Sequence, residues 1–186
     1  PHMGQSLAVF GSGSVGMSAL MAARAIGLTT IIAVDLVKER LDLARTLGAT
    51  HVINPSMTPD TVAEIKKITS HGVNFSFETT GAPKVLRQAV EALAPRGTCG
   101  FVGAAPLGTE VSLDVMDIMA QGKKLRGIVE GDSTPDVFIP QLIELHRQGR
   151  FPFDRLVTFY PFERINDGIN DSESCKVVKP VVRMPT

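Results

Sequence analysis

Two patterns of apolar residues alternate along the first 130 residues of the chain. Short apolar runs predict strands that are buried on both faces, as in a parallel sheet. Between them, apolar residues recur every three or four positions, which is the period of a helix with one buried face. The runs lie at residues 6–10, 30–34, 51–54, 73–78, 98–102 and 125–130, and the helical segments at residues 15–26, 38–47, 61–70, 83–93 and 114–121. This order predicts an α/β fold with a doubly wound, six-stranded parallel sheet.

The pattern changes near residue 135. A helix is expected to begin at Pro135, because proline is favoured at the first helical position. Beyond it, the sequence predicts extended segments at residues 155–160 and 177–184, with a helix at 161–170 between them. The six-stranded sheet needs none of these elements. We therefore expect three parts, which are a tag remnant (1–3), the sheet domain (4–135) and a tail that belongs to another domain (136–186).

A glycine-rich turn joins the first predicted strand to the first predicted helix. Gly11, Gly13 and Gly16 have the spacing Gly-x-Gly-x-x-Gly. In dinucleotide sites the first glycine allows the tight turn, the second lets backbone approach the diphosphate, and the third lets the helix pack closely. The N–H groups of Ser14, Val15 and Gly16 would then face the phosphates, where the helix dipole favours negative charge. Glycine turns also begin helices for structural reasons, so this motif does not decide the ligand alone.

An acidic residue stands at the end of the second predicted strand. Asp35 follows the apolar run 30–34, at about the ~20-residue spacing expected after the glycine turn. A carboxylate there accepts hydrogen bonds from the hydroxyls of an adenosine ribose and repels a 2′-phosphate. Together, strand, turn, helix and acid predict a dinucleotide site that takes NAD in preference to NADP. Lys38 and Arg40 are close enough in sequence to keep NADP as the alternative.

Composition and charge narrow the function classes. The chain of 186 residues is 44% hydrophobic with a formal net charge of zero, which gives no basis for attraction to nucleic acid or a membrane surface. No apolar stretch approaches the ~20 residues of a membrane span, and no signal peptide opens the chain. Cys99 and Cys175 are far apart and lack Cys-x-x-Cys spacing, so neither a metal site nor a disulfide is predicted. Such cysteine usage favours a cytoplasmic origin.

Motifs spread over the whole chain after residue 3 carry a family resemblance. They comprise the glycine turn at 11–16, the segments 35–40, 75–81 and 101–103, and the segment 161–166 in the tail. In this order they resemble the cofactor-binding domain of the medium-chain, zinc-dependent alcohol dehydrogenases, which has the Rossmann fold. Segments 126–132, 139–140 and 150–154 are most similar to the aryl- and benzyl-alcohol branch of that family.

The resemblance implies how this chain relates to a whole enzyme. In the family, an N-terminal catalytic domain precedes the sheet, holds most of the zinc ligands and receives the C-terminal tail. We therefore expect NAD as the cofactor, zinc only in the intact enzyme, and a small alcohol or aldehyde as its substrate. This chain is expected to bind the dinucleotide without oxidising an alcohol, and we assign it no catalytic residue. The family also pairs subunits through the edge strand, here 125–130, which predicts a homodimer.

The resemblance also implies which further residues contact the cofactor. Arg40 would lie near the adenosine ribose held by Asp35, and Lys179 would help to neutralise the diphosphate. Glu130 differs from the apolar residue of many relatives and would approach the nicotinamide ring. The full set implied is Gly11, Gly13, Ser14, Val15, Gly16, Asp35, Leu36, Arg40, Thr80, Gly81, Val102, Gly103, Ala104, Ile128, Glu130 and Lys179.

Two other functions stay open at this stage. One is a zinc-free quinone or enoyl reductase of the same superfamily, which would use NADPH and which Asp35 argues against. The other is a nucleotide-sensing module without enzymatic activity. Cofactor titration separates the first from an NAD-dependent alcohol dehydrogenase, and the sequence upstream in the gene separates the second.

Overall fold

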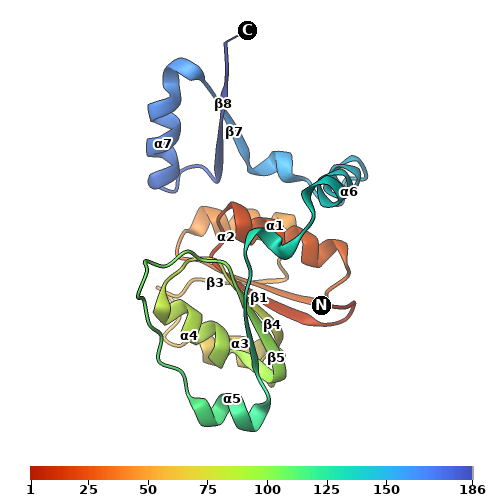
Figure 1. Ribbon diagram of the computed structural model, residues 1–186, viewed down its shortest axis with the longest axis vertical. Coiled ribbons are helices and arrows are strands. Elements are labelled where there is room, and N and C mark those ends of the chain that lie inside the picture. The colour runs from red at the N-terminus through yellow and green to blue at the C-terminus, as the bar shows by residue number, and fades with distance from the viewer. Residues whose placement is uncertain (186) are drawn as a thin grey trace.

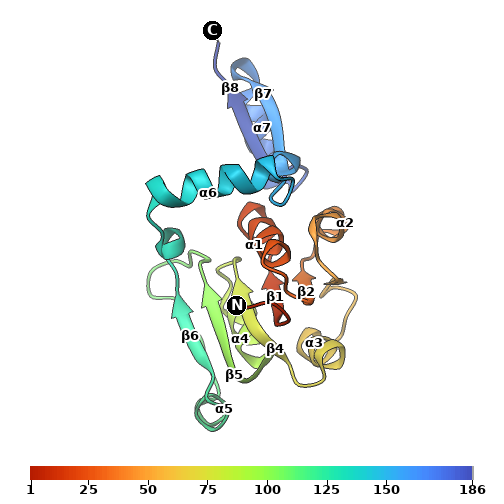
Figure 2. The same cartoon turned by 90° about the vertical axis from the view of Figure 1, so that its right-hand side faces the viewer.

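The computed structural model describes residues 1–185 and contains a six-stranded sheet in the order β3-β2-β1-β4-β5-β6 (Figures 1 and 2). Every neighbouring pair of strands is parallel, which confirms the predicted fold class. The strands are β1 Ser6–Phe10, β2 Thr30–Val34, β3 His51–Ile53, β4 Val73–Glu78, β5 Leu93–Phe101 and β6 Lys124–Gly127. The helices between them are α1 Ser14–Ala25, α2 Lys38–Leu47, α3 Thr61–Thr69, α4 Pro83–Glu91 and α5 Val115–Gln121.

Side chains of each central strand alternate between two hydrophobic layers. On β1, Leu7 and Val9 pack with α1 and α2, whereas Ala8 and Phe10 pack with α3 and α4. This alternation follows from the two-residue period of a strand, and it explains why β1 is apolar from Leu7 to Phe10. The strand order reverses between β1 and β4, where ligands of open α/β sheets bind outside the carboxyl ends of the strands.

Two predicted boundaries differ from the structure on the later strands. The strand β5 begins at Leu93, directly after α4, because Leu93 pairs with Val73 before a register shift across Pro95. The strand β6 ends at Gly127, so the predicted strand 125–130 was wrong beyond that point. Glu130 has a φ of 48° and begins a short 3-10 helix, η1 Glu130–Asp132. A left-handed backbone cannot continue a strand, so the edge strand is shorter than its apolar pattern indicated.

The C-terminal segment crosses the sheet domain and then leaves it (Figure 1). Its elements are α6 Pro135–Arg147, η2 Phe153–Leu156, β7 Val157–Pro161, η3 Phe162–Arg164, α7 Ile165–Glu173 and β8 Lys179–Arg183. Phe151 and Leu156 are buried in the same layer as α1 and α2, and Leu142 and Leu145 of α6 pack against that layer. The strands β7 and β8 then pair in parallel as a separate two-stranded sheet.

The part formed by β7, η3, α7 and β8 lies beyond α6, away from the six-stranded sheet (Figure 2). The hydroxyl of Tyr160 donates a hydrogen bond of 2.7 Å to the Asp171 carboxylate and ties β7 to α7. Phe162 and Ile165 expose 44% and 38% of their surface, so this part carries exposed apolar side chains. Val178 packs against the layer of α1 and α2.

Candidate functional site

The glycine turn lies between β1 and α1 at the carboxyl edge of the sheet. Gly11 has a φ of 93°, which L side chains rarely adopt, and a Cβ there would lie 2.5 Å from Thr79 Oγ1. A Cβ on Gly16 would lie 1.9 Å from the carbonyl oxygen of Gly11. Gly13 differs, because no atom lies within 4 Å of its Cβ position. Two of the glycines are therefore required by close packing, and the third leaves open space above the turn.

The first turn of α1 keeps its donors free for a ligand. The first N–H groups of any helix lack partners within it, and here they belong to Ser14, Val15 and Gly16. Gly13 is the N-cap residue and offers no side chain that could accept from them. Free N–H groups at the positive end of a helix dipole form an anion site. The binding of a diphosphate at this turn stays a prediction.

Asp35 follows β2 and lies beside the glycine turn. Its Oδ2 accepts a hydrogen bond of 2.6 Å from the N–H of Ser12, and its Oδ1 accepts one of 2.9 Å from the N–H of Val37. The carboxylate therefore links the turn after β1 to the turn that begins α2. The sequence predicted that Asp35 lies close to the glycine turn, although 23 positions separate Asp35 from Ser12.

A cavity of about 500 Å³ opens beside this carboxylate. Of the predicted cofactor residues, it brings together Gly11, Asp35, Leu36, Arg40 and Thr80. Its remaining wall includes side chains of the segment before α3 and of α4. The cavity has the size of a small-molecule site and mixes apolar walls with few polar groups. Both residues predicted near the adenosine ribose, Asp35 and Arg40, line this cavity.

The other predicted residues fall elsewhere. Gly81 and Gly103 line a neighbouring cavity of about 240 Å³, together with Glu78. Ile128 lines an apolar cavity of about 410 Å³ that also contacts Phe75 and Phe77. Eight of the sixteen predicted contacts line none of these cavities; they are Gly13, Ser14, Val15, Gly16, Val102, Ala104, Glu130 and Lys179. Ala104 touches the turn after β4, since its carbonyl oxygen lies 2.9 Å from the Cβ position of Gly81.

Two residues at these cavities were missed by sequence reasoning. Cys175, in the loop between α7 and β8, lines the larger cavity about 140 positions after Asp35. No local pattern signals such a contact, because it depends on the path of the tail across the sheet domain. Glu78 is 1% exposed at the end of β4, and its acidic side chain within an apolar run was the available signal. Cys99 is buried as expected, and burial raises the pKa of its thiol to about 11.

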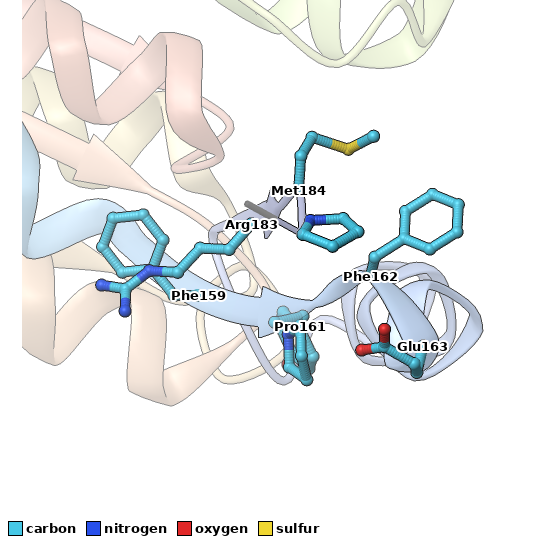
Figure 3. A pocket seen from close by; sticks show the side chains of 8 residues that line it. Phe159, Pro161, Phe162, Glu163, Arg183 and Met184 are labelled. Carbon is cyan, nitrogen blue, oxygen red and sulfur yellow. The ribbon is translucent and has the colours of Figure 1, made fainter.

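A further pocket of about 370 Å³ lies at the far end of the tail, between the ends of β7 and β8 (Figure 3). The guanidinium of Arg183 sits 4.2 Å from the ring centre of Phe159, beside Pro161 and Met184. This pocket is remote from the glycine turn and offers no phosphate-binding backbone. It belongs to the exposed apolar surface of the tail.

Among residues 1–185, no three His, Cys, Asp or Glu side chains gather closely enough to hold a metal ion. Over the same residues, no helix combines the length and apolar character needed to cross a bilayer.

Comparison with known proteins agrees with this geometry. A family model described as zinc-binding dehydrogenase matches residues 14–146. The chain is 42% identical to geraniol dehydrogenase of Castellaniella defragrans over 179 residues, which cover 96% of this chain and 48% of that protein.

Solved structures give the same result. The structure of an alcohol dehydrogenase zinc-binding domain protein from Burkholderia ambifaria matches with a TM-score of 0.97 at 56% identity, over 100% of this chain and 50% of that one. Benzyl alcohol dehydrogenase from Acinetobacter calcoaceticus matches with a TM-score of 0.96 at 49% identity, over 99% of this chain and 51% of that one. The chain thus spans about half the length of these relatives. Together with the glycine turn and Asp35, the match over residues 14–146 shows that the chain belongs to the zinc-binding dehydrogenase family.

Proposed function

We propose that this chain is the NAD(H)-binding half of a zinc-dependent alcohol dehydrogenase. The observation that carries the proposal is the position of the Asp35 carboxylate, which contacts the glycine turn and lines the cavity of about 500 Å³. The N–H groups at the start of α1 would bind the diphosphate, and Asp35 would accept hydrogen bonds from the adenosine ribose. Thr80, Gly81 and Gly103 would line the path from the ribose toward the nicotinamide.

The choice of NAD over NADP rests on charge. A 2′-phosphate beside Asp35 would place two anions in one small cavity, where the dielectric constant is low and repulsion is strong. Arg40 lines the same cavity and could attract that phosphate, and its Nε is buried without a hydrogen-bond partner within the described chain. We assign NAD because the carboxylate is fixed by two backbone donors beside the turn.

The substrate is proposed to be an aryl or benzyl alcohol, which the intact enzyme would convert to the aldehyde. The names of the similar proteins support this class, since geraniol and benzyl alcohol are both primary alcohols next to an unsaturated carbon. In such an enzyme a bound nicotinamide would supply the hydride acceptor and zinc would supply a Lewis acid for the alcohol oxygen. This chain would contribute placement of the cofactor, with zinc ligands supplied by the other half of the enzyme, so we propose that it is inactive alone.

The edge strand β6 is proposed to pair with its copy in a homodimer. Its residues 124–127 are all exposed, and its outer edge has no partner strand within residues 1–185. An open edge of this kind is suited to extending the sheet across a two-fold axis. Sedimentation at micromolar concentration tests this proposal, and a clean monomer would contradict it.

Calorimetric titration with NADH and NADPH tests the cofactor assignment. We expect NADH to bind more tightly by about tenfold or more, since one charge-assisted hydrogen bond contributes about 1.5–3 kcal/mol. The variant Asp35→Asn keeps an acceptor oxygen for one neighbouring N–H and removes the charge, so its preference for NADH should largely disappear. The variant Asp42→Asn is the matched control, because it removes an exposed carboxylate on α2 that does not line the cavity, and it should leave NADH affinity within about twofold. Tighter binding of NADPH by the unaltered chain would instead support a zinc-free reductase.

A further inference from the structure

Glu78 is a buried acid whose carboxylate accepts hydrogen bonds from the turn that follows it. It is the last residue of β4 and is 1% exposed. Its Oε1 accepts hydrogen bonds from the N–H of Thr80 at 2.6 Å and of Gly81 at 3.1 Å, and also from the Thr80 hydroxyl. Burial of a carboxylate is costly unless donors replace its water. Here the turn 79–81 supplies those donors, so the acid and the turn fix one another.

The same turn touches the glycine turn after β1. The Thr79 hydroxyl lies within hydrogen-bond distance of the carbonyl oxygens of Phe10 and Gly11, at 2.9 Å and 3.1 Å. A Cβ on Gly11 would lie 2.9 Å from the methyl carbon of Thr80. The turn held by Glu78 therefore rests directly against the first residue of the phosphate-binding turn.

On its other side, the turn touches the end of β5. A Cβ on Gly103 would lie 2.0 Å from the N atom of Gly81 and 2.8 Å from Oε2 of Glu78. Val102 continues this contact, because its N–H donates to the carbonyl oxygen of Glu78 at 3.0 Å. The carboxyl ends of β4 and β5 lie side by side along one edge of the sheet (Figure 2). Glu78 thus sits where the turns after β4 and β5 meet.

Glu78 itself does not line the larger cavity, whereas Gly11 and Thr80 do. We propose that Glu78 is a positioning residue for the dinucleotide, acting through the turn 79–81 on the walls formed by Gly11, Thr80 and Gly103. This inference rests on the proposed function. Loss of the carboxylate would release the turn 79–81 from the turns after β1 and β5. The space between the cavities of about 500 Å³ and about 240 Å³ would then widen.

The test compares NADH affinity with stability in Glu78→Gln. The amide has nearly the same size, and its oxygen can replace Oε1. Its NH₂ group would then face the N–H of Gly81, which lies 3.3 Å from Oε2 in the unaltered chain. We expect NADH binding to weaken about tenfold, the change that follows from losing one hydrogen bond to a charged group. Both proteins are titrated at a temperature where circular dichroism shows them equally folded. A role limited to stability would lower the melting temperature and leave the affinity of the folded protein unchanged.

Cys99→Ala is the matched control. Cys99 is fully buried on β5, the strand beside β4. Its thiol donates a weak hydrogen bond of 3.8 Å to the carbonyl oxygen of Gly100, which lies outside the turn 79–81. Its melting temperature should fall while its NADH affinity stays within about twofold, because only packing in the interior changes. An affinity for NADH in Glu78→Gln within twofold of the unaltered chain overturns the inference and leaves the proposed function intact. Failure of the unaltered chain to bind NADH or NADPH overturns both.

A second variant keeps the test decisive if Glu78→Gln does not fold. Thr79→Val removes the hydroxyl that contacts the ends of β1 and retains the shape of the side chain. We expect NADH affinity to fall about threefold to tenfold, since one neutral hydrogen bond to the phosphate-binding turn is lost. Affinity equal to that of the unaltered chain would show that the turn does not position the dinucleotide, and would overturn the inference.

Discussion

Gly13 and Gly16 belong to one motif, yet the structure assigns them separable roles. Gly16→Ala places a methyl group whose carbon starts 1.9 Å from the carbonyl oxygen of Gly11, so helix and turn must separate by about 1 Å. Overpacking of this kind costs about 1–3 kcal/mol, and the obstacle here is backbone, which favours the upper end. Alanine recovers about 1 kcal/mol through its higher helix propensity. The net loss is about 2 kcal/mol, or a fall of about 4–8 °C in melting temperature for a chain of this size.

Gly13→Ala should behave in the opposite way. Its Cβ position has no atom within 4 Å, and its φ of −76° suits alanine, so the melting temperature should fall by only about 1–2 °C through poorer N-capping. The added methyl group would instead occupy the space that a diphosphate needs above the turn. NADH affinity should fall by about tenfold or more. Differential scanning calorimetry and NADH titration on both variants test this pair of roles. The reasoning fails if Gly16→Ala melts with the unaltered chain or if Gly13→Ala binds NADH equally well.

Two further predictions concern side-chain pairs outside the site. Asp117→Asn should lower the free energy of urea unfolding by about 3 kcal/mol, because the buried ammonium of Lys123 loses its charged partner. The Lys123 side chain is 1% exposed, and its ammonium lies 2.7 Å from the Asp117 carboxylate. A loss below about 1 kcal/mol would contradict this prediction. Hydrogen bonds from Tyr160 and Lys176 lower the pKa of Asp171 below its usual 3.8, so this contact stabilises the tail above that pH and is lost as pH falls through the lowered value. Hydrogen exchange of β7 and β8 should therefore accelerate near pH 3 relative to pH 6 after correction for intrinsic rates, and Tyr160→Phe should abolish most of that difference.

The elements that the sequence predicted well are those whose local pattern and tertiary setting agree. Strands β1 and β2 are apolar at four of their five positions because helices cover both faces at the centre of the sheet, and their boundaries match the prediction at both ends. The motif from Gly11 to Gly16 also acts locally, since a few adjacent residues form the whole turn. Its relation to Asp35 could be inferred because parallel strands bring their carboxyl ends to one edge.

The features that the sequence did not predict depend on contacts distant along the chain. Ile128 and Val129 extend the apolar run beyond β6, yet a φ of 48° at Glu130 ends any strand there, and an ion pair joins Arg126 to Asp132 across this bend. Cys175 reaches the cavity only because the tail crosses the sheet domain. The position of Lys179 on β8, away from the cavities, likewise depends on the path of the tail.

The glycines of the site follow one physical rule that extends beyond the recognised motif. At the end of β1, Gly16 is required by the backbone of Gly11, and at the end of β5, Gly103 is required by the backbone of Gly81. Each pair approaches to a distance that a Cβ atom would forbid. The turn after β4 thus contacts both of its neighbours, the turn after β1 through the Thr79 hydroxyl and the turn after β5 through the close approach of Gly81 to Gly103. Because backbone cannot change rotamer to relieve a clash, a displacement of any one turn moves its neighbours, and the cleft at this edge responds as a single unit.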